Sequence, residues 1–217
     1  MVANHFAPFE ELASSLLPML DSKGDSAHDH AHLQRVWLNV QQIRAQEGGD
    51  FEILAASVLL HDCVFVPKHS PERSRASRLA AVRARSILQA LNWAPKRIDI
   101  VAGAIETHSY SAGLEPYTLE GRVLQDADRL DAIGFIGIAR CFYTAGRLGS
   151  QLYDPSDAQG TKRELNDSLF ALDHFPRKLL LLAEGFKTST GQRLACARHE
   201  VLQKFYGGIM AEIGNPV

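Results

Sequence analysis

Nearly all of the periodic hydrophobic pattern in this chain of 217 residues has the spacing of an α-helix. Between about Asp29 and Gln46, for example, Leu33, Val36, Val40 and Ile43 recur at the intervals that place them on one helix face. The alternation of apolar and polar residues that is typical of half-buried β-strands is absent from the sequence. The pattern therefore predicts an all-α fold, a helical bundle with short connections.

Capping and helix-breaking residues set the expected helix boundaries. Asp50 can cap the third helix, and Ser70 followed by Pro71 indicates the start of a long fourth helix. Capping-box patterns that begin at Thr161 and Ser189 predict two more helices further along the chain. The expected helices cover about 9–20, 29–46, 51–62, 70–91, 95–107, 118–133 and 134–147, then a helix that opens at 161 and is kinked or split by Pro176, and a last helix that opens at 189.

The composition is that of an ordinary globular protein, with 46% hydrophobic and 22% charged residues. A net charge of −2 provides no overall field that would attract nucleic acid or an anionic membrane. Cys63, Cys141 and Cys196 are odd in number and far apart, which favours reduced thiols, and no apolar stretch approaches a membrane-spanning length. We therefore expect one cytoplasmic, soluble domain over residues 1–217, with neither nucleic acid nor membrane as a partner. The sequence does not indicate an oligomeric state.

The run from Ile53 to Leu60 is apolar on every face and ends in His61 and Asp62. Such a helix belongs in the middle of a bundle, where two ionisable groups at its tip incur a desolvation penalty unless a partner compensates for it. A bound cation supplies that compensation directly. The alternative is a helix-terminal Asp62 that pairs with a neighbouring arginine, and we favour the metal.

Two other helices offer ligands for the same ion. His32 borders the buried stripe of its helix, although a lone histidine there could equally be bonded to a backbone carbonyl. Asp128 and Asp131 lie one turn apart beside a buried stripe, whereas Asp126 points about 200° from Asp128 and is expected to be a solvated charge. Two His and two Asp suit one divalent ion that keeps open positions for water. The predicted metal ligands are His32, His61, Asp62 and Asp128.

Other polar residues near this set are candidates for substrate binding or chemistry. His108 follows the fifth helix and could donate to phosphate, act as a general acid, bind metal, or lie on the surface. Basic residues are dense between 68 and 85, and most of them are expected to face solvent. Lys68, Arg75 and Arg78 are near enough in sequence to His61 and Asp62 to hold phosphate oxygens.

Three stretches carry a family resemblance: HDHAHLQRV at 28–36, LLHD at 59–62 and DADRLDAIG at 126–134. Together they resemble the HD-domain metal-dependent phosphohydrolase superfamily, and within it the small bacterial branch of predicted hydrolases. The resemblance spans roughly residues 25–180 and implies an HD-type helical core there, with the C-terminal helices packing on it. Carried over position by position, it implies the same four metal ligands.

The resemblance implies hydrolysis of a phosphate ester or anhydride of a small substrate, with a nucleotide as the favoured class. No glutamate follows His61 and Asp62 closely, unlike in some nucleotidases of the superfamily, and the consecutive histidines of its two-metal phosphodiesterases are also missing. A single principal ion is therefore expected. Mn²⁺ suits the mixed nitrogen and oxygen ligands, and Co²⁺, Fe²⁺, Ni²⁺ and Mg²⁺ are alternatives.

The remaining candidate residues are assigned roles in metal-assisted hydrolysis of a phosphate. His108, Asp131 and Lys68 are the candidate catalytic groups, and Lys68, Arg75 and Arg78 are the candidate substrate-binding groups. Two other functions stay open: a phosphodiesterase acting on a cyclic or oligomeric nucleotide, and a non-catalytic sensor that binds metal and nucleotide.

Overall fold

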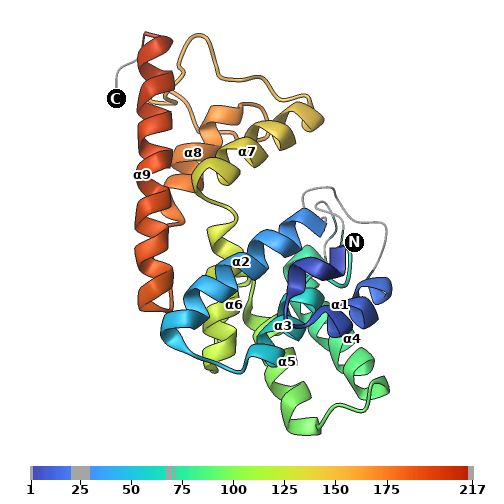
Figure 1. Cartoon of the computed structure of the whole chain (residues 1–217). Coiled ribbons are helices and arrows are strands. Elements are labelled where there is room, and N and C mark those ends of the chain that lie inside the picture. Colours follow the sequence, from blue (N-terminus) through green and yellow to red (C-terminus); the bar gives the residue numbers. More distant parts are fainter. Residues whose placement is uncertain (1, 21–29, 67–69, 71, 215–217) are drawn as a thin grey trace. The chain divides into compact units, whose positions relative to one another are not determined.

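The computed structural model describes residues 2–20, 30–66, 70 and 72–214, and these residues are helical or irregular, with no β-strand among them (Figure 1). The predicted all-α class is confirmed. The α-helices are α1 (Glu10–Leu16), α2 (His30–Glu47), α3 (Phe51–Leu60), α4 (Ala76–Ala90), α5 (Pro95–Thr107), α6 (Leu119–Leu130), α7 (Gly134–Leu148), α8 (His174–Arg177) and α9 (Ser189–Glu212). Short 3-10 helices are η1 (Val2–Phe6), η2 (Leu17–Met19), η4 (Arg73–Arg75), η5 (Tyr110–Ala112), η6 (Ala171–Asp173) and η7 (Leu179–Leu181).

The chain divides into two compact units. The first contains Met1–Arg129 and Lys187–Gly191, and the second contains Leu130–Phe186 and Gln192–Val217. The expectation of one domain over residues 1–217 stays a prediction. In the part of the chain that the structure describes, no helix combines the length and the apolar character needed to cross a bilayer.

Helix α3 is the centre of the first unit. Every residue from Ile53 to Leu60 is buried, as the apolar run predicted. Asp50 caps the helix, because its carboxylate accepts a hydrogen bond of 3.0 Å from the amide of Ile53. Helices α1, α2 and α5 pack against α3, and α4 packs along α5. The ring of Trp37 on α2 stacks on Phe51 at the start of α3, with 5.0 Å between their centroids.

The second unit has an aromatic core. Phe142 of α7, Phe175 of α8 and Phe205 of α9 contact one another, with ring centroids 5.6 to 6.0 Å apart. A buried ion pair joins Asp131, just after α6, to the guanidinium of Arg140 on α7 at 2.7 Å. These contacts connect the three helices of the unit across its interior.

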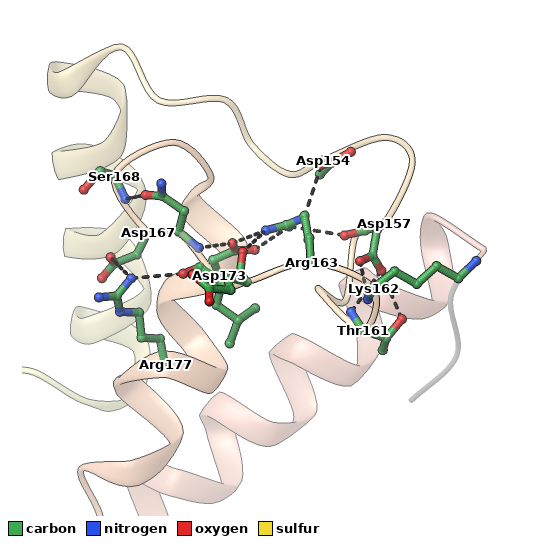
Figure 2. A network of polar contacts seen from close by, with 12 residues as sticks. Asp154, Asp157, Thr161, Lys162, Arg163, Asp167, Ser168, Asp173 and Arg177 are labelled. Carbon is green, nitrogen blue, oxygen red and sulfur yellow. Dashed lines mark hydrogen bonds and ion pairs between the residues drawn. The ribbon is translucent and has the colours of Figure 1, made fainter.

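The predicted helix that opens at Thr161 does not form, and residues 161–170 are irregular instead. The amide and hydroxyl of Thr161 donate to one carboxylate oxygen of Asp157 at 3.0 and 3.1 Å, and the amide of Lys162 donates to the other at 2.7 Å. Arg163 then forms two hydrogen bonds of 2.6 and 2.8 Å with the carboxylate of Asp173 (Figure 2). Side-chain hydrogen bonds to local backbone thus compete successfully with the helix here.

Two further boundaries differ from expectation. Helix α4 begins at Ala76, after η4, and not at Ser70, whose hydroxyl accepts a bond of 3.2 Å from the amide of Glu72. Pro71 lies outside the described residues. The last helix begins where predicted, but its cap is Thr188, whose hydroxyl accepts a bond of 2.9 Å from the amide of Gly191.

Candidate metal centre

The four predicted metal ligands converge within the first unit. His32 lies in the first turn of α2, His61 and Asp62 directly follow α3, and Asp128 lies in the last turn of α6. The Nε2 atoms of His32 and His61 are 3.2 Å apart. Asp128 Oδ1 is 3.4 Å from the first of these nitrogens and 3.8 Å from the second. Asp62 Oδ2 is 3.9 Å from His32 Nε2 and 3.4 Å from His61 Nε2.

These separations are those of donor atoms around one ion. With bonds of about 2.1 Å, two donors at right angles are about 3.0 Å apart and two opposed donors are about 4.2 Å apart. The five distances above, 3.2 to 3.9 Å, all fall between these limits. Each of the two imidazole nitrogens thus lies next to the other and to one oxygen of each carboxylate, an arrangement that a cation would satisfy. Two overlapping groups of side chains have donor atoms close enough for one ion, His32 with His61 and Asp128, and His61 with Asp62 and His108, and a divalent metal fits these donors.

His61 is held in the form that binds metal. Its Nδ1 donates a hydrogen bond of 2.8 Å to the carbonyl of Val58, so its Nε2 turns a lone pair to the cluster. Burial lowers the pKa of His61 to about 4; the nearby imidazoles of His108 and His32 also lower it, and the carboxylates of Asp62 and Asp128 act in the opposite direction. The side chain is therefore neutral at pH 7.

Asp128 is held in the ionised form. Burial by itself would raise the pKa of its carboxyl group, but the adjacent His32, together with His61 and His108, more than offsets that effect. The pKa of Asp128 is consequently well below its ordinary value. A negative charge next to the neutral imidazole of His61 gives the electrostatics of a cation site.

His108 faces the same cluster from the end of α5. Its side chain is buried, which excludes the alternative of a surface residue. Its Nδ1 donates a hydrogen bond of 2.6 Å to the carbonyl of Ile105, and its Nε2 lies 3.8 Å from Asp62 Oδ1. Asp62 thus turns one oxygen toward His32 and His61, and the other toward His108. Gln125 of α6 holds this segment by donating to the carbonyl of Thr107 at 2.7 Å.

Among the described residues, Arg75, Arg78 and Asp131 contribute no atoms to this cluster. The guanidinium groups of Arg75 and Arg78 are exposed and pair with Glu72 and Glu106 at 4.0 and 3.5 Å. Asp131 pairs with Arg140 in the second unit, as described above. Lys68 lies outside the described residues. The roles of these four residues in catalysis or substrate binding stay predictions.

Asp126 is a correction to the sequence analysis, because it is fully buried and not a solvated charge. Its carboxylate accepts hydrogen bonds from the amides of Lys187 and Thr188 at 2.9 and 2.8 Å, and from the hydroxyl of Thr188 at 2.7 Å. Burial raises the pKa of Asp126, although these hydrogen bonds lower it in part. Helix α6 is therefore anchored on the face opposite to Asp128.

Two contacts show how α6 is held. Gly191 packs so closely on Asp126 that a Cβ atom there would lie 2.3 Å from Asp126 Oδ2. Asn39 lies on the buried face of α2, two turns after His32, where an amide needs a partner. It donates a hydrogen bond of 2.9 Å to the carbonyl of Ala127, the residue before Asp128. Asn39 and Asp126 together hold the segment of α6 that carries Asp128.

Comparison with known proteins gives consistent matches. A family model of the HD domain matches residues 30–133. The Bacillus subtilis (strain 168) protein YpgQ is 33% identical over 184 residues, which are 83% of this chain and 82% of YpgQ. The crystal structure of YpgQ in complex with ADP matches with a TM-score of 0.71 at 29% identity, covering 99% of this chain and 98% of that one. An HD-superfamily hydrolase from Bacillus thuringiensis matches with a TM-score of 0.70 at 29% identity, covering 94% and 97%.

Proposed function

Because this chain belongs to the HD domain family, whose solved members include an HD-superfamily hydrolase, we propose that it is a divalent-metal-dependent phosphohydrolase. Its proposed substrate is a phosphate ester or anhydride of a small molecule, a nucleotide in particular. The observation that carries the proposal is the short distance, 3.2 to 3.9 Å, from the imidazole nitrogens of His32 and His61 to each other and to the carboxylates of Asp62 and Asp128.

The ligand chemistry supports a hard or borderline divalent ion. When bound, such an ion supplies an acidified water and a positive charge for a phosphoryl oxygen. His32 and His61 would hold it through their Nε2 atoms, and Asp62 and Asp128 would neutralise its charge. Mn²⁺ is our proposal for a mixed nitrogen and oxygen set, with Co²⁺, Fe²⁺, Ni²⁺ and Mg²⁺ as alternatives.

His108 is our first candidate for proton transfer. It is buried beside Asp62, and its Nε2 is aimed at the cluster while its Nδ1 is bonded to a carbonyl. From that position it can donate a proton to a leaving oxygen or a hydrogen bond to a phosphoryl oxygen. Asp131 and Lys68 remain proposed catalytic groups, with Lys68, Arg75 and Arg78 as the phosphate-binding groups. Arg75 lies at the end of η4, which packs against η5 just after His108.

A nucleotide is the proposed substrate class because the relative YpgQ has been crystallised with ADP and resembles this chain over nearly its whole length. Two other functions are alternatives for the same residues. A phosphodiesterase would cleave a cyclic or oligomeric nucleotide, and a sensor would bind metal and nucleotide without turnover.

The test is the release of phosphate and pyrophosphate from a panel of nucleoside mono-, di- and triphosphates and cyclic nucleotides, with and without Mn²⁺. We expect metal-dependent release from the linear nucleotides. Asp128→Ala should reduce it by more than about a hundred-fold, because a charged ligand is removed. Asp99→Ala is the matched control, since this exposed carboxylate on α5 pairs only with Arg85 among the contacts described, outside the cluster.

The outcomes separate the three functions. Cleavage of cyclic nucleotides alone would replace the proposal by the phosphodiesterase. Tight nucleotide binding with no release from any member of the panel would replace it by the sensor. Release that is equal in wild type and Asp128→Ala would contradict the proposed centre.

A further inference from the structure

Tyr110 is an exposed aromatic residue between two segments of the metal centre. It opens η5, two residues after His108, and 47% of its surface is exposed. Because two residues of chain span at most about 7 Å, the backbone of Tyr110 is tied closely to that of His108. The side chain of His108 is buried against Asp62, whereas that of Tyr110 is open to solvent.

One face of the Tyr110 ring is already occupied by a cation. The guanidinium carbon of Arg129 lies 3.6 Å from the ring centroid, close enough for a strong cation–π contact. Arg129 is buried, so this contact is shielded from water. Arg129 also directly follows Asp128 on α6, and adjacent Cα atoms are about 3.8 Å apart. The ring of Tyr110 therefore lies between two segments of the cluster: its own backbone follows His108, and the Arg129 that covers it follows Asp128.

An exposed ring that is held rigidly in this way can receive a second flat group. Tyr110 remains 47% exposed although Arg129 lies over its ring. Nucleic-acid bases stack on aromatic side chains, and all of them can do so because each has a π face. The guanidinium on the buried side holds the ring in place, which reduces the ordering cost of stacking.

The geometry points to Tyr110 as the residue that stacks on the base of a bound nucleotide. This inference rests on the proposed function and deepens it, because it selects phosphorylated substrates that carry a base over those that do not. Stacking involves no reading of base edges, so purine and pyrimidine nucleotides should both be accepted. Tyr110 would act on substrate affinity and not on the metal.

The test compares binding of ADP with binding of pyrophosphate, which has no base, by titration calorimetry in the presence of Mn²⁺. We expect Tyr110→Ala to weaken ADP binding by about five-fold to a hundred-fold, the range of base–aromatic stacking. Pyrophosphate binding should change by less than about two-fold. Tyr110→Phe keeps the ring and should bind both ligands as the wild type does. Tyr110→Leu keeps an apolar side chain over Arg129 without a π face and should behave as Tyr110→Ala.

Tyr117→Ala is the matched control. This tyrosine lies in the same connection between α5 and α6 and is 68% exposed. Its hydroxyl, however, packs against Gly103 of α5. Its loss should leave the affinity for both ligands unchanged. A melting curve of each variant verifies that it is folded.

Three results would overturn the inference. Tyr110→Ala could bind ADP as tightly as wild type, it could lose ADP and pyrophosphate affinity equally, or the wild type could bind ADP no more tightly than pyrophosphate. Failure of the proposed function gives a different result. In that case the wild type releases nothing from any nucleotide, while the binding comparison still tests Tyr110 directly.

Discussion

Replacing Asp126 by alanine is expected to destabilise the fold although it leaves all four metal ligands in place. The buried carboxylate accepts hydrogen bonds from two backbone amides and one hydroxyl, at Lys187 and Thr188. Hydrogen bonds to a charged group contribute about 1.5–3 kcal/mol each, and buried donors left without an acceptor are costly. The desolvation of Asp126, visible in its raised pKa, offsets part of this gain. We therefore expect a loss of about 3 kcal/mol in the free energy of unfolding.

A loss of this size lowers the melting temperature of a chain of 217 residues by about 6–12 °C. The assay is thermal unfolding at pH 7 with chelator, combined with metal content after loading at low temperature. Asp128→Ala provides the contrast in metal content, since it removes a proposed ligand; the lowered pKa of Asp128 means that the metal-free stability also falls when this carboxylate is lost.

The two variants should therefore dissociate stability from metal binding. Asp126→Ala should melt early but bind the ion when folded, whereas Asp128→Ala should hold no chelatable metal and should melt at the same temperature with and without chelator. Asp126→Asn, which keeps one acceptor oxygen, should melt between Asp126→Ala and the wild type. A melting temperature of Asp126→Ala within about 2 °C of wild type would refute the anchoring role of this carboxylate, and retention of the ion by Asp128→Ala would refute the ligand assignment.

Chelation should lower the melting temperature of the wild type, because a ligand at a hundred times its Kd stabilises the folded state by about 2.7 kcal/mol; coincident curves with and without chelator would contradict a metal in this cluster. The free energy of unfolding of the metal-free protein should fall by about 3 kcal/mol between pH 6.5 and pH 4. The pKa of His61 is about 4 in the folded state and 6.5 in the reference state, so the unfolded chain binds an extra proton in this range. Denaturant titrations that give the same free energy of unfolding across this range, or the same fall for His61→Gln, would argue against it. His108→Gln should reduce kcat by at least about ten-fold with unchanged metal content, and a parallel loss of metal would make His108 a ligand instead.

The sequence predicts those parts of the centre that depend on local pattern. An apolar run that ends in His61 and Asp62 shows a buried helix and two charges that need a partner, and both follow from consecutive residues. The angle between successive residues of a helix also places Asp128 and Asp126 on opposite faces. That angle does not show what covers each face.

The environment of Asp126 is set by a segment about sixty residues further along the chain, so the sequence near it carries no signal of burial. Thr161 shows a different limit of local pattern. A capping-box threonine can be satisfied by a turn as well as by a helix, and here the carboxylate of Asp157 takes its hydrogen bonds. The same segment is held by the contacts of Arg163 with Asp173, which no local pattern predicts.

The central claim is that one divalent ion is held jointly by His32, His61, Asp62 and Asp128. Anomalous diffraction from crystals grown with Mn²⁺ tests it most directly, because the ion's position is located independently of any assay. We predict one strong peak about 2.0–2.4 Å from the Nε2 atoms of His32 and His61 and from one carboxylate oxygen each of Asp62 and Asp128. A peak elsewhere in the chain, or one that lacks either His32 or Asp128 among its ligands, would contradict the account.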